Sequence, residues 1–254
     1  MKRTFIITQL ILFTIFCQKV TFANTNTTLQ KANTAYQAGF YENAATLYEQ
    51  IIEQGKVSSV IYYNLGNSYF KMDEISKAIL NYERALKLDP SNEDITYNLR
   101  IANNKIVDKI DQLPQLFYIK WWKSLKQLSS PDGWATLFII FFFTFFLITA
   151  FFLLSTSIRL RRTFLISGLV ILVFSALSFI LALQTYKESA FNRDAIVFTP
   201  SLPVKSSPEE SGIDLFVIHE GLKVQIIDHL TGWEEIRIAN GSKGWVKSET
   251  IERI

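Results

Sequence analysis

Residues 134–154 read WATLFIIFFFTFFLITAFFLL, and residues 164–183 read FLISGLVILVFSALSFILAL. Neither stretch contains a charged residue, and each is about as long as the roughly 20 residues that a helix needs to cross a bilayer. Because peptide groups in hydrocarbon must be hydrogen-bonded within their own segment, the pattern predicts a transmembrane helical hairpin with a loop at residues 155–163. Two buried helices of a soluble core are the alternative, but such helices seldom stay apolar on all faces for this length.

The loop at residues 155–163 indicates the orientation of the hairpin. It contains Arg159, Arg161 and Arg162, and basic residues in short loops tend to stay in the cytoplasm. Residues 1–23 agree with this orientation, because two basic residues, an apolar run and small residues follow one another as in a signal peptide; an uncut anchor would give the same sidedness. We therefore expect the folded parts before and after the hairpin to lie together outside the cytoplasm.

The composition argues against most catalytic chemistry. The net charge of +3 over 254 residues is too small to indicate nucleic-acid binding. Cys17 is the only cysteine and lies in the leader, so the cleaved chain has no disulfide, thiol nucleophile or cysteine–zinc site. His219 and His229 lack the spacing of a metal pair, and no Gly-rich phosphate loop or nucleophile elbow occurs. The sequence predicts no enzyme, no metal and no cofactor; an undetected enzyme would have only leftover carboxylates to use.

Residues 28–110 contain an internal repeat. Ala44 and Tyr48 recur as Ala78 and Tyr82 after 34 residues, the tetratricopeptide period, which predicts two helix–turn–helix units followed by a capping helix. We therefore expect an all-α tetratricopeptide superhelix. In the second and clearer unit the residues at the expected positions are Tyr62, Leu65, Gly66, Tyr69, Ala78, Tyr82, Ala85 and Pro90.

Stacked repeats of this kind form a concave surface that binds extended peptides or partner helices. Asn33 and Asn67 are one period apart, as are Tyr36 and Phe70, and Tyr63 lies on the same side. A primary amide both donates to and accepts from a peptide backbone, and aromatic faces hold side chains. We therefore predict that these five residues line a partner-binding groove. The alternative is that they are solvated or packed against the third helix.

Residues 111–133 connect the repeats to the hairpin. Within them, residues 113–128 mix aromatic and aliphatic side chains with lysines and contain no acidic residue. This composition predicts an amphipathic segment in the headgroup layer, with Trp121 and Trp122 at the interface. An ordinary linker helix packed on the repeats is the alternative.

Residues 195–254 have the character of a small all-β domain. Asn240 and Gly241 form a strong hairpin signal, because both tolerate the positive φ of a tight turn. The runs that read as strands are residues 195–199, 214–219, 222–228, 233–239 and 243–247. So many short strands in so little chain predict a closed barrel.

The glycine–tryptophan pairs at Gly232-Trp233 and Gly244-Trp245 resemble the bacterial SH3-like module. The resemblance implies a domain that recognises cell-wall peptides or partner proteins. Trp233 and Trp245 are candidate ligand contacts, although in that fold at least one such tryptophan usually packs into the barrel.

The order of the parts also resembles the BatE family of the Bacteroides aerotolerance operon over nearly the whole chain. The resemblance implies an envelope protein that works beside von Willebrand factor A-type Bat proteins, with a link to oxygen tolerance and oxidative stress. It is carried by Tyr97-Asn98-Leu99, Asp108-Lys109-Ile110, Trp121-Trp122, Asp132-Gly133-Trp134, Val204-Lys205-Ser206-Ser207-Pro208 and Leu215-Phe216-Val217-Ile218-His219-Glu220-Gly221.

Two functions are consistent with this layout. The first, given the implied envelope location, is a non-catalytic scaffold of the bacterial inner membrane in which the repeats and the SH3-like domain both face the periplasm and bind other envelope proteins. The second is an envelope anchor or sensor whose SH3-like domain binds peptidoglycan.

Overall fold

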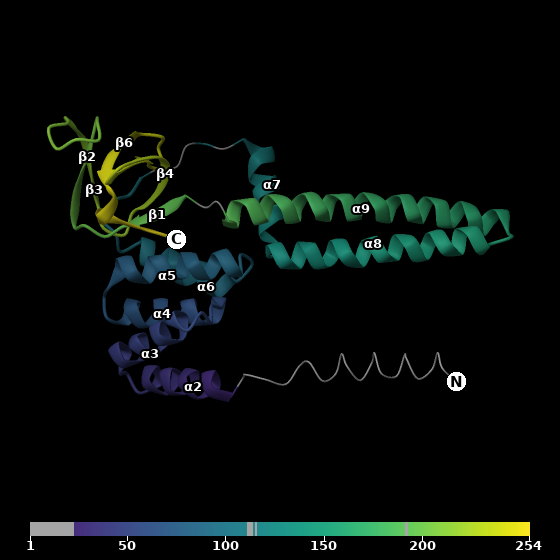
Figure 1. Ribbon diagram of the computed structural model, residues 1–254, viewed down its shortest axis with the longest axis horizontal. Helices are drawn as coiled ribbons and strands as arrows, with labels where there is room; N and C mark the ends of the chain where they lie inside the picture. The colour runs from purple at the N-terminus through teal and green to yellow at the C-terminus, as the bar shows by residue number, and fades with distance from the viewer. Residues whose placement is uncertain (1–22, 111–113, 115, 191–192) are drawn as a thin grey trace. The chain divides into compact units, whose positions relative to one another are not determined.

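The computed structural model describes residues 23–110, 114, 116–190 and 193–254, so nearly all of the leader predicted over residues 1–23 lies outside the described residues (Figure 1). The chain divides into two compact units at the boundary between Val57 and Ser58. A helical repeat region, two long apolar helices and a C-terminal antiparallel sheet are all present, which confirms the multidomain layout.

The first unit contains a pair of helices, α2 (Ala23–Gln37) and α3 (Tyr41–Glu53). Gly39 has φ +83° in the turn between them, a conformation that glycine adopts without steric cost. The side chains that pack α2 against α3 are small or lie on one helical face, and those that are buried include Ala32, Ala44, Ala45, Tyr48 and Ile51.

The second unit begins with three helices, α4 (Ser59–Lys71), α5 (Ile75–Leu88) and α6 (Glu93–Asn103). The side chains of Ser58 and Asn92 cap α4 and α6, because each accepts a hydrogen bond from the main-chain N–H three residues later.

Gly66 allows α4 and α5 to approach closely. A Cβ atom at Gly66 would lie 2.7 Å from the ring of Tyr82, so no larger residue fits this crossing without a shift. The glycine and the tyrosine therefore act together as the packing pair of the second repeat.

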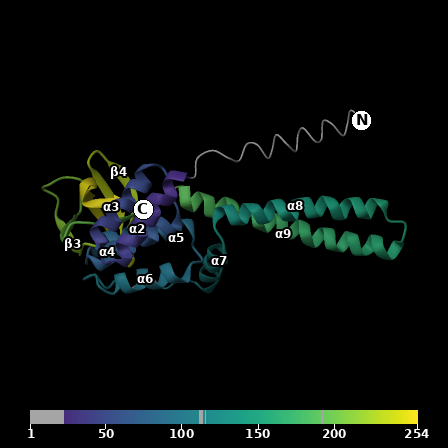
Figure 2. The same cartoon turned by 90° about the horizontal axis from the view of Figure 1, so that it is seen from below.

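The hairpin consists of α8 (Pro131–Leu154) and α9 (Ile158–Ala190), which run side by side in both views (Figures 1 and 2). Three phenylalanine pairs along the crossing show that the helices are antiparallel: Phe138–Phe179, Phe141–Phe174 and Phe151–Phe164, with ring centroids 5.1–5.9 Å apart. At 1.5 Å per residue the 24 residues of α8 extend about 36 Å, compared with a hydrocarbon core of about 30 Å. By length and composition both helices are able to cross a membrane.

The connection between the hairpin helices is shorter than the predicted loop. Because α9 begins at Ile158, only residues 155–157 join the helices, and Arg159, Arg161 and Arg162 lie in the first turns of α9. Arginine is a good helix former and no glycine or proline interrupts the stretch, so the helix extends through it.

A short helix, α7 (Phe117–Gln127), precedes the hairpin, and none of its residues is buried. The indole N–H of Trp122 donates to Gln184 Oε1 on α9 at 2.8 Å, and Lys126 forms an ion pair with Glu188. Trp134 in turn donates to the main-chain oxygen of Lys126 at 3.2 Å, so α7 is fixed to the same end of both hairpin helices.

The C-terminal domain is one seven-stranded antiparallel sheet with the order β3-β2-β6-β5-β4-β1-β7. The strands are β1 (Asp194–Val197), β2 (Ser201–Lys205), β3 (Asp214–His219), β4 (Lys223–Leu230), β5 (Trp233–Arg237), β6 (Lys243–Lys247) and β7 (Ile251–Arg253). Its core is aliphatic and includes Val197, Val204, Ile218, Val224, Ile236 and Val246.

The prediction of a closed barrel is not confirmed. Within residues 193–254 no ladder joins the two edge strands β3 and β7, so the sheet is open. Because β7 has only three residues, it can form few hydrogen bonds with a further strand. The main-chain oxygen of Arg253 in β7 already accepts a hydrogen bond from Arg84 of α5 at 2.9 Å.

Two strands, β2 and β7, were not predicted from the sequence. Pro203 lies inside β2 although prolines normally interrupt ladders. Pro203 lies opposite Val217 in the β2–β3 pair, and on its other side β2 pairs with β6 only at Lys205, so there is little ladder on the β6 side for its missing N–H to interrupt.

Candidate partner-binding site

The second repeat and the capping helix present a cluster of amide and aromatic side chains, which we call the α4–α6 face: Tyr63, Asn67, Phe70, Tyr97 and Asn98. Asn67 lies at its centre. Its Oδ1 accepts hydrogen bonds from Tyr82 Oη at 2.8 Å and from Asn98 Nδ2 at 2.9 Å. Asn98 Nδ2 also donates to Tyr63 Oη at 2.9 Å, so this one amide group joins α6 to α4.

The first unit repeats the central contact. Asn33 Oδ1 accepts a hydrogen bond from Tyr48 Oη at 2.7 Å, the same relation as that of Asn67 to Tyr82 one period later. In both units the asparagine oxygen therefore holds the tyrosine of the second helix of its own repeat. Tyr36, the remaining predicted residue of this unit, is half-buried and packs edge-on against Tyr41 at 5.4 Å.

Two cations lie beside aromatic rings of the α4–α6 face. Tyr97 is 55% exposed, and the Cζ atom of Arg100 lies 5.4 Å from the centre of its ring. Lys105 Nζ lies 4.8 Å from the ring centre of Phe70 and pairs with Asp73 at 2.7 Å. This face therefore combines aromatic surface, amide groups and nearby cations, a combination suited to an extended peptide.

Sequence reasoning did not include Tyr97, Asn98 or Lys105 in the site. Tyr97 follows Tyr63 by one 34-residue period, so the repeat itself contained the signal. Asn98 follows Asn64 by the same period, so the repeat also marks its position, although its contacts with Tyr63 and Asn67 arise only on folding. Nothing local marks Lys105, because its role comes from contacts with residues more than 30 positions away.

The α5 side of the repeat has a different use, since the sheet packs against it. We call this contact the α5 seam. His219 donates its main-chain N–H to Asp108 Oδ2 at 2.6 Å, and its Nδ1 lies 2.9 Å from Asp108 Oδ1. Gly221 has φ +82°, and a Cβ atom there would lie 2.5 Å from Ile106 Cγ2 and 3.4 Å from Ile79 Cδ1. The seam therefore has no room for a side chain at Gly221.

Charged groups complete the α5 seam. Lys223 Nζ pairs with Glu83 at 2.8 Å and with Asp194 at 3.1 Å. Burial alone lowers the pKa of Lys223, but the carboxylates of Glu83 and Asp194 together outweigh burial and raise the pKa above 10.5. Arg84 binds Glu252 of β7 at 2.9 Å. Helix α5 therefore contacts β4 and β7, the two strands that pair with β1.

Trp233 and Trp245 both lie on the face of the sheet opposite to its core. Their neighbours along the strands, Glu234, Ile236 and Val246, are buried, while both tryptophans are half-buried. The register places the two tryptophans diagonally across the β5–β6 pair, with Trp233 opposite Lys247 and Trp245 opposite Glu235. The structure thus brings them together on one surface, and neither packs into the core.

The two histidines lie apart from one another. His219 belongs to the α5 seam, and His229 Nδ1 lies 3.1 Å from Glu234 Oε1. Among the described residues no group of three or more His, Cys, Asp and Glu side chains is arranged to hold a metal ion.

Comparison with known proteins identifies the repeat. The family described as "Tetratricopeptide repeat" matches residues 59–92, the span of the second helix pair. "Tetratricopeptide repeat protein 12" of Homo sapiens is 32% identical over 74 residues, 29% of this chain and 10% of that protein. "Tetratricopeptide repeat protein 6" of Homo sapiens is 37% identical over 65 residues, 26% of this chain and 12% of that protein. The matched segment thus spans about a tenth of each of these relatives.

Among solved structures, two crystal structures of MamA are similar at 18% identity and a TM-score of 0.30. They cover 66% of this chain and 81% and 76% of their own. Similarity at this level supports no argument about the present chain. The sequence matches alone establish a protein that contains tetratricopeptide repeats, and such repeats indicate protein–protein interaction.

Proposed function

We propose that this chain is a non-catalytic scaffold of the bacterial inner membrane, in which the α4–α6 face and the sheet bind other envelope proteins in the periplasm. The observation that carries the proposal is the α5 seam. Hydrogen bonds from His219 to Asp108 and from Lys223 to Glu83 connect chain segments that lie on either side of the hairpin. Segments in direct contact share one compartment, so the hairpin enters and leaves the membrane on the same side.

The exposed surface of the hairpin supports insertion into a membrane. Large apolar side chains such as Phe143, Leu147 and Leu169 are 57–68% exposed, and in water a patch of this kind would cause aggregation. In a bilayer the same side chains contact lipid. The arginines at the start of α9 then lie in the cytoplasm, and the repeats and the sheet lie in the periplasm.

The partners that we propose are von Willebrand factor A-type Bat proteins, in an assembly linked to aerotolerance or oxidative stress. The support is the similarity to the BatE family, and several residues that carry it lie in the α5 seam. Asp108, His219 and Gly221 belong to the stretches in which the chain resembles that family, and they contact the opposite segment across the seam. A scaffold of this family therefore needs its repeats and its sheet fixed together.

Cysteine labelling of intact cells tests the arrangement. In a Cys17→Ser background, Ser91→Cys reports on the repeats, Ser211→Cys on the sheet and Ser157→Cys on the hairpin turn; all three positions are exposed. After permeabilisation of the outer membrane, a membrane-impermeant maleimide is expected to label the first two and to reach Ser157→Cys only after solubilisation. Labelling of the repeats and the sheet from opposite sides would end the proposal.

Peptidoglycan binding through the sheet is the second candidate function, favoured by the paired tryptophans on its outer face. Sedimentation of the full chain in micelles with purified cell-wall material measures it. Loss of sedimentation in Trp233→Ala and Trp245→Ala, with Ile213→Ala as the exposed apolar control outside the strands, would favour this function over the scaffold.

A further inference from the structure

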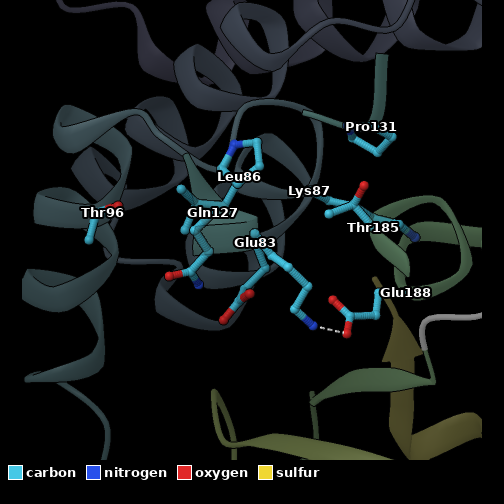
Figure 3. A pocket seen from close by; sticks show the side chains of 10 residues that line it. Glu83, Leu86, Lys87, Thr96, Gln127, Pro131, Thr185 and Glu188 are labelled. Atoms are coloured by element: carbon cyan, nitrogen blue, oxygen red, sulfur yellow. Dashed lines mark hydrogen bonds and ion pairs between the residues drawn. The ribbon is translucent and has the colours of Figure 1, made fainter. Parts of the chain in front are cut away.

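A cavity of about 380 Å³ lies where α5 and α6 meet α7 and the ends of the two hairpin helices (Figure 3). Its volume is within the range of about 300–1,000 Å³ that is usual for small-molecule sites. The polar side chains that line it include Glu83, Lys87, Thr96, Lys126, Thr185 and Glu188.

The cavity lies at the end of the apolar part of the hairpin. Thr185 and Glu188 follow Leu183, the last residue of the charge-free run, and Pro131 at the start of α8 also lines the cavity. If the hairpin spans the bilayer as proposed above, this end of both helices lies at the level of the lipid headgroups. The inference therefore rests on the proposed function.

The lining carries two positive and two negative charges. Lys126 pairs with Glu188, and Glu83 pairs with Lys223 at 2.8 Å. Lys87 donates to the main-chain oxygen of Ile254 at 3.2 Å, and among the described residues no side-chain carboxylate forms an ion pair with it. Partial burial, together with the neighbouring Arg84, lowers the pKa of Lys87. The nearby carboxylate of Asp194 acts in the opposite direction, and an anionic group beside Lys87 would add a direct ion pair.

The two threonines of the lining offer lone pairs, whereas Gln127, the third uncharged polar side chain, has both an acceptor oxygen and an N–H donor group. Thr96 Oγ1 donates its hydrogen to Asn92 O at 3.0 Å, and Thr185 Oγ1 donates to Leu181 O at 2.7 Å. Both hydroxyl oxygens can therefore only accept from a ligand. Figure 3 shows Thr185 and Glu188 on the same side of the cavity, so two acceptors lie near one another there.

We propose that this cavity binds the headgroup of a zwitterionic phospholipid that carries a phosphodiester and a primary ammonium group, as in phosphatidylethanolamine. The phosphodiester pairs with Lys87, and the ammonium donates to the oxygens of Thr185 and Glu188. A lining with balanced charges suits a ligand of zero net charge better than an anionic headgroup, because an extra negative charge would face Glu83 and Glu188 without compensation.

Native mass spectrometry of the full chain in detergent micelles, with lipids of defined headgroup, tests the proposal. We expect one phosphatidylethanolamine to be retained per chain, with weaker retention of phosphatidylcholine, whose quaternary ammonium has no hydrogen to donate. We expect phosphatidylglycerol to be retained more weakly as well, and inorganic phosphate not to displace the bound lipid.

Variants assign the binding to the cavity. Lys87→Gln is expected to weaken phosphatidylethanolamine retention at least tenfold, and Thr185→Val to reduce the preference for phosphatidylethanolamine over phosphatidylcholine. Lys123→Gln on α7 makes the same charge change outside the lining and is expected to leave retention unchanged.

Preference for phosphatidylglycerol, displacement by inorganic phosphate, or equal loss in Lys123→Gln and Lys87→Gln would each overturn the headgroup site. Alkaline extraction of membranes keeps the two proposals separate. A chain that stays in the membrane but does not discriminate among headgroups refutes only the cavity proposal, whereas a chain that is extracted refutes the proposed function.

Discussion

The α4–α6 face and the α5 seam lie on the same repeat but differ in what covers them. In the seam the sheet covers α5, and Gly221 has no room for a Cβ atom. The carboxylate of Asp108 contacts the main-chain N–H and the ring Nδ1 of His219. On the α4–α6 face Tyr97 is 55% exposed, and the amide groups of Asn67 and Asn98 form their hydrogen bonds within the repeat.

The difference separates structural contacts from candidate binding contacts. Substitutions in the seam should loosen the sheet from the repeats, whereas substitutions at exposed positions of the α4–α6 face should affect partners and leave the fold intact. Asn67 belongs to both groups, because its oxygen holds Tyr82 and Asn98. Its replacement would therefore not separate binding from stability, and Tyr97 is the better probe of the face.

Gly221→Ala should have the largest effect. The new Cβ atom would meet Ile106 at 2.5 Å and would impose the left-handed φ on an alanine, and we expect a loss of about 2–5 kcal/mol in the local stability of the seam. Hydrogen exchange of the sheet amides in the full chain measures the loss as the free energy of local opening.

Gly232→Ala is the matched control for Gly221→Ala. Gly232 has φ +80°, but a Cβ atom there would meet nothing within 4 Å, so this variant has only the backbone cost of about 1–2 kcal/mol. Equal losses in the two variants would show that packing in the seam contributes nothing.

Asp108→Ala should have the next largest effect. It removes the acceptor for the main-chain N–H of His219, and we expect the opening free energy at that amide to fall by about 1–3 kcal/mol. Asp108→Asn keeps a side-chain oxygen and should lose less. If the His219 amide exchanges at the same rate in all three proteins, the hydrogen bond does not hold the seam.

The Lys223–Glu83 pair should contribute less. Because the Lys223 side chain is 39% exposed, a double-mutant cycle with Lys223→Gln and Glu83→Gln should give a coupling of about 0.2–1 kcal/mol. The pKa of Lys223 is raised, so as the pH rises from neutral this coupling stays fully present up to pH 10.5 and is lost only above it. A coupling that disappears as the pH rises between about 7 and 9 would contradict this assignment.

Tyr97→Ala should change stability least, by about 0.5 kcal/mol or less, because the side chain is mostly in solvent. It should nevertheless reduce the amount of partner captured by crosslinking in membranes, since exposed aromatic residues often dominate interface energies. Leu88→Ala, at the 42% exposed end of α5, is the control. Equal capture by both variants and the parent chain would remove Tyr97 from the site.

Local patterns predicted the helical parts of the molecule well. The charge-free runs at residues 134–154 and 164–183 lie within α8 and α9, and the 34-residue period is confirmed by the family match over residues 59–92. Both signals depend on neighbours along one helix, so the sequence contains them in full. Boundaries were less certain, as the start of α9 at Ile158 shows.

The sheet shows where local patterns fail. Because prolines usually interrupt strands, Pro203 makes β2 look like a loop in the sequence, and β7 is too short to produce an alternating pattern. Whether the edges of a sheet pair depends on the register of strands that are distant in sequence, and here the edges stay apart. For the same reason the outward position of Trp233 and Trp245 follows from pairing, and composition alone did not reveal it.

The sequence by itself determined the repeat, the apolar hairpin and most of the strands, because each depends on periodicity within a short segment. Only the tertiary structure decided that Asp108 meets His219, that Gly221 meets Ile106, and that Asn67 is shared by three helices. These contacts join residues that are up to 115 positions apart, as between Gly221 and Ile106, and no local propensity encodes such a pairing. The distinction between the covered α5 seam and the exposed α4–α6 face therefore arises only when the chain is folded.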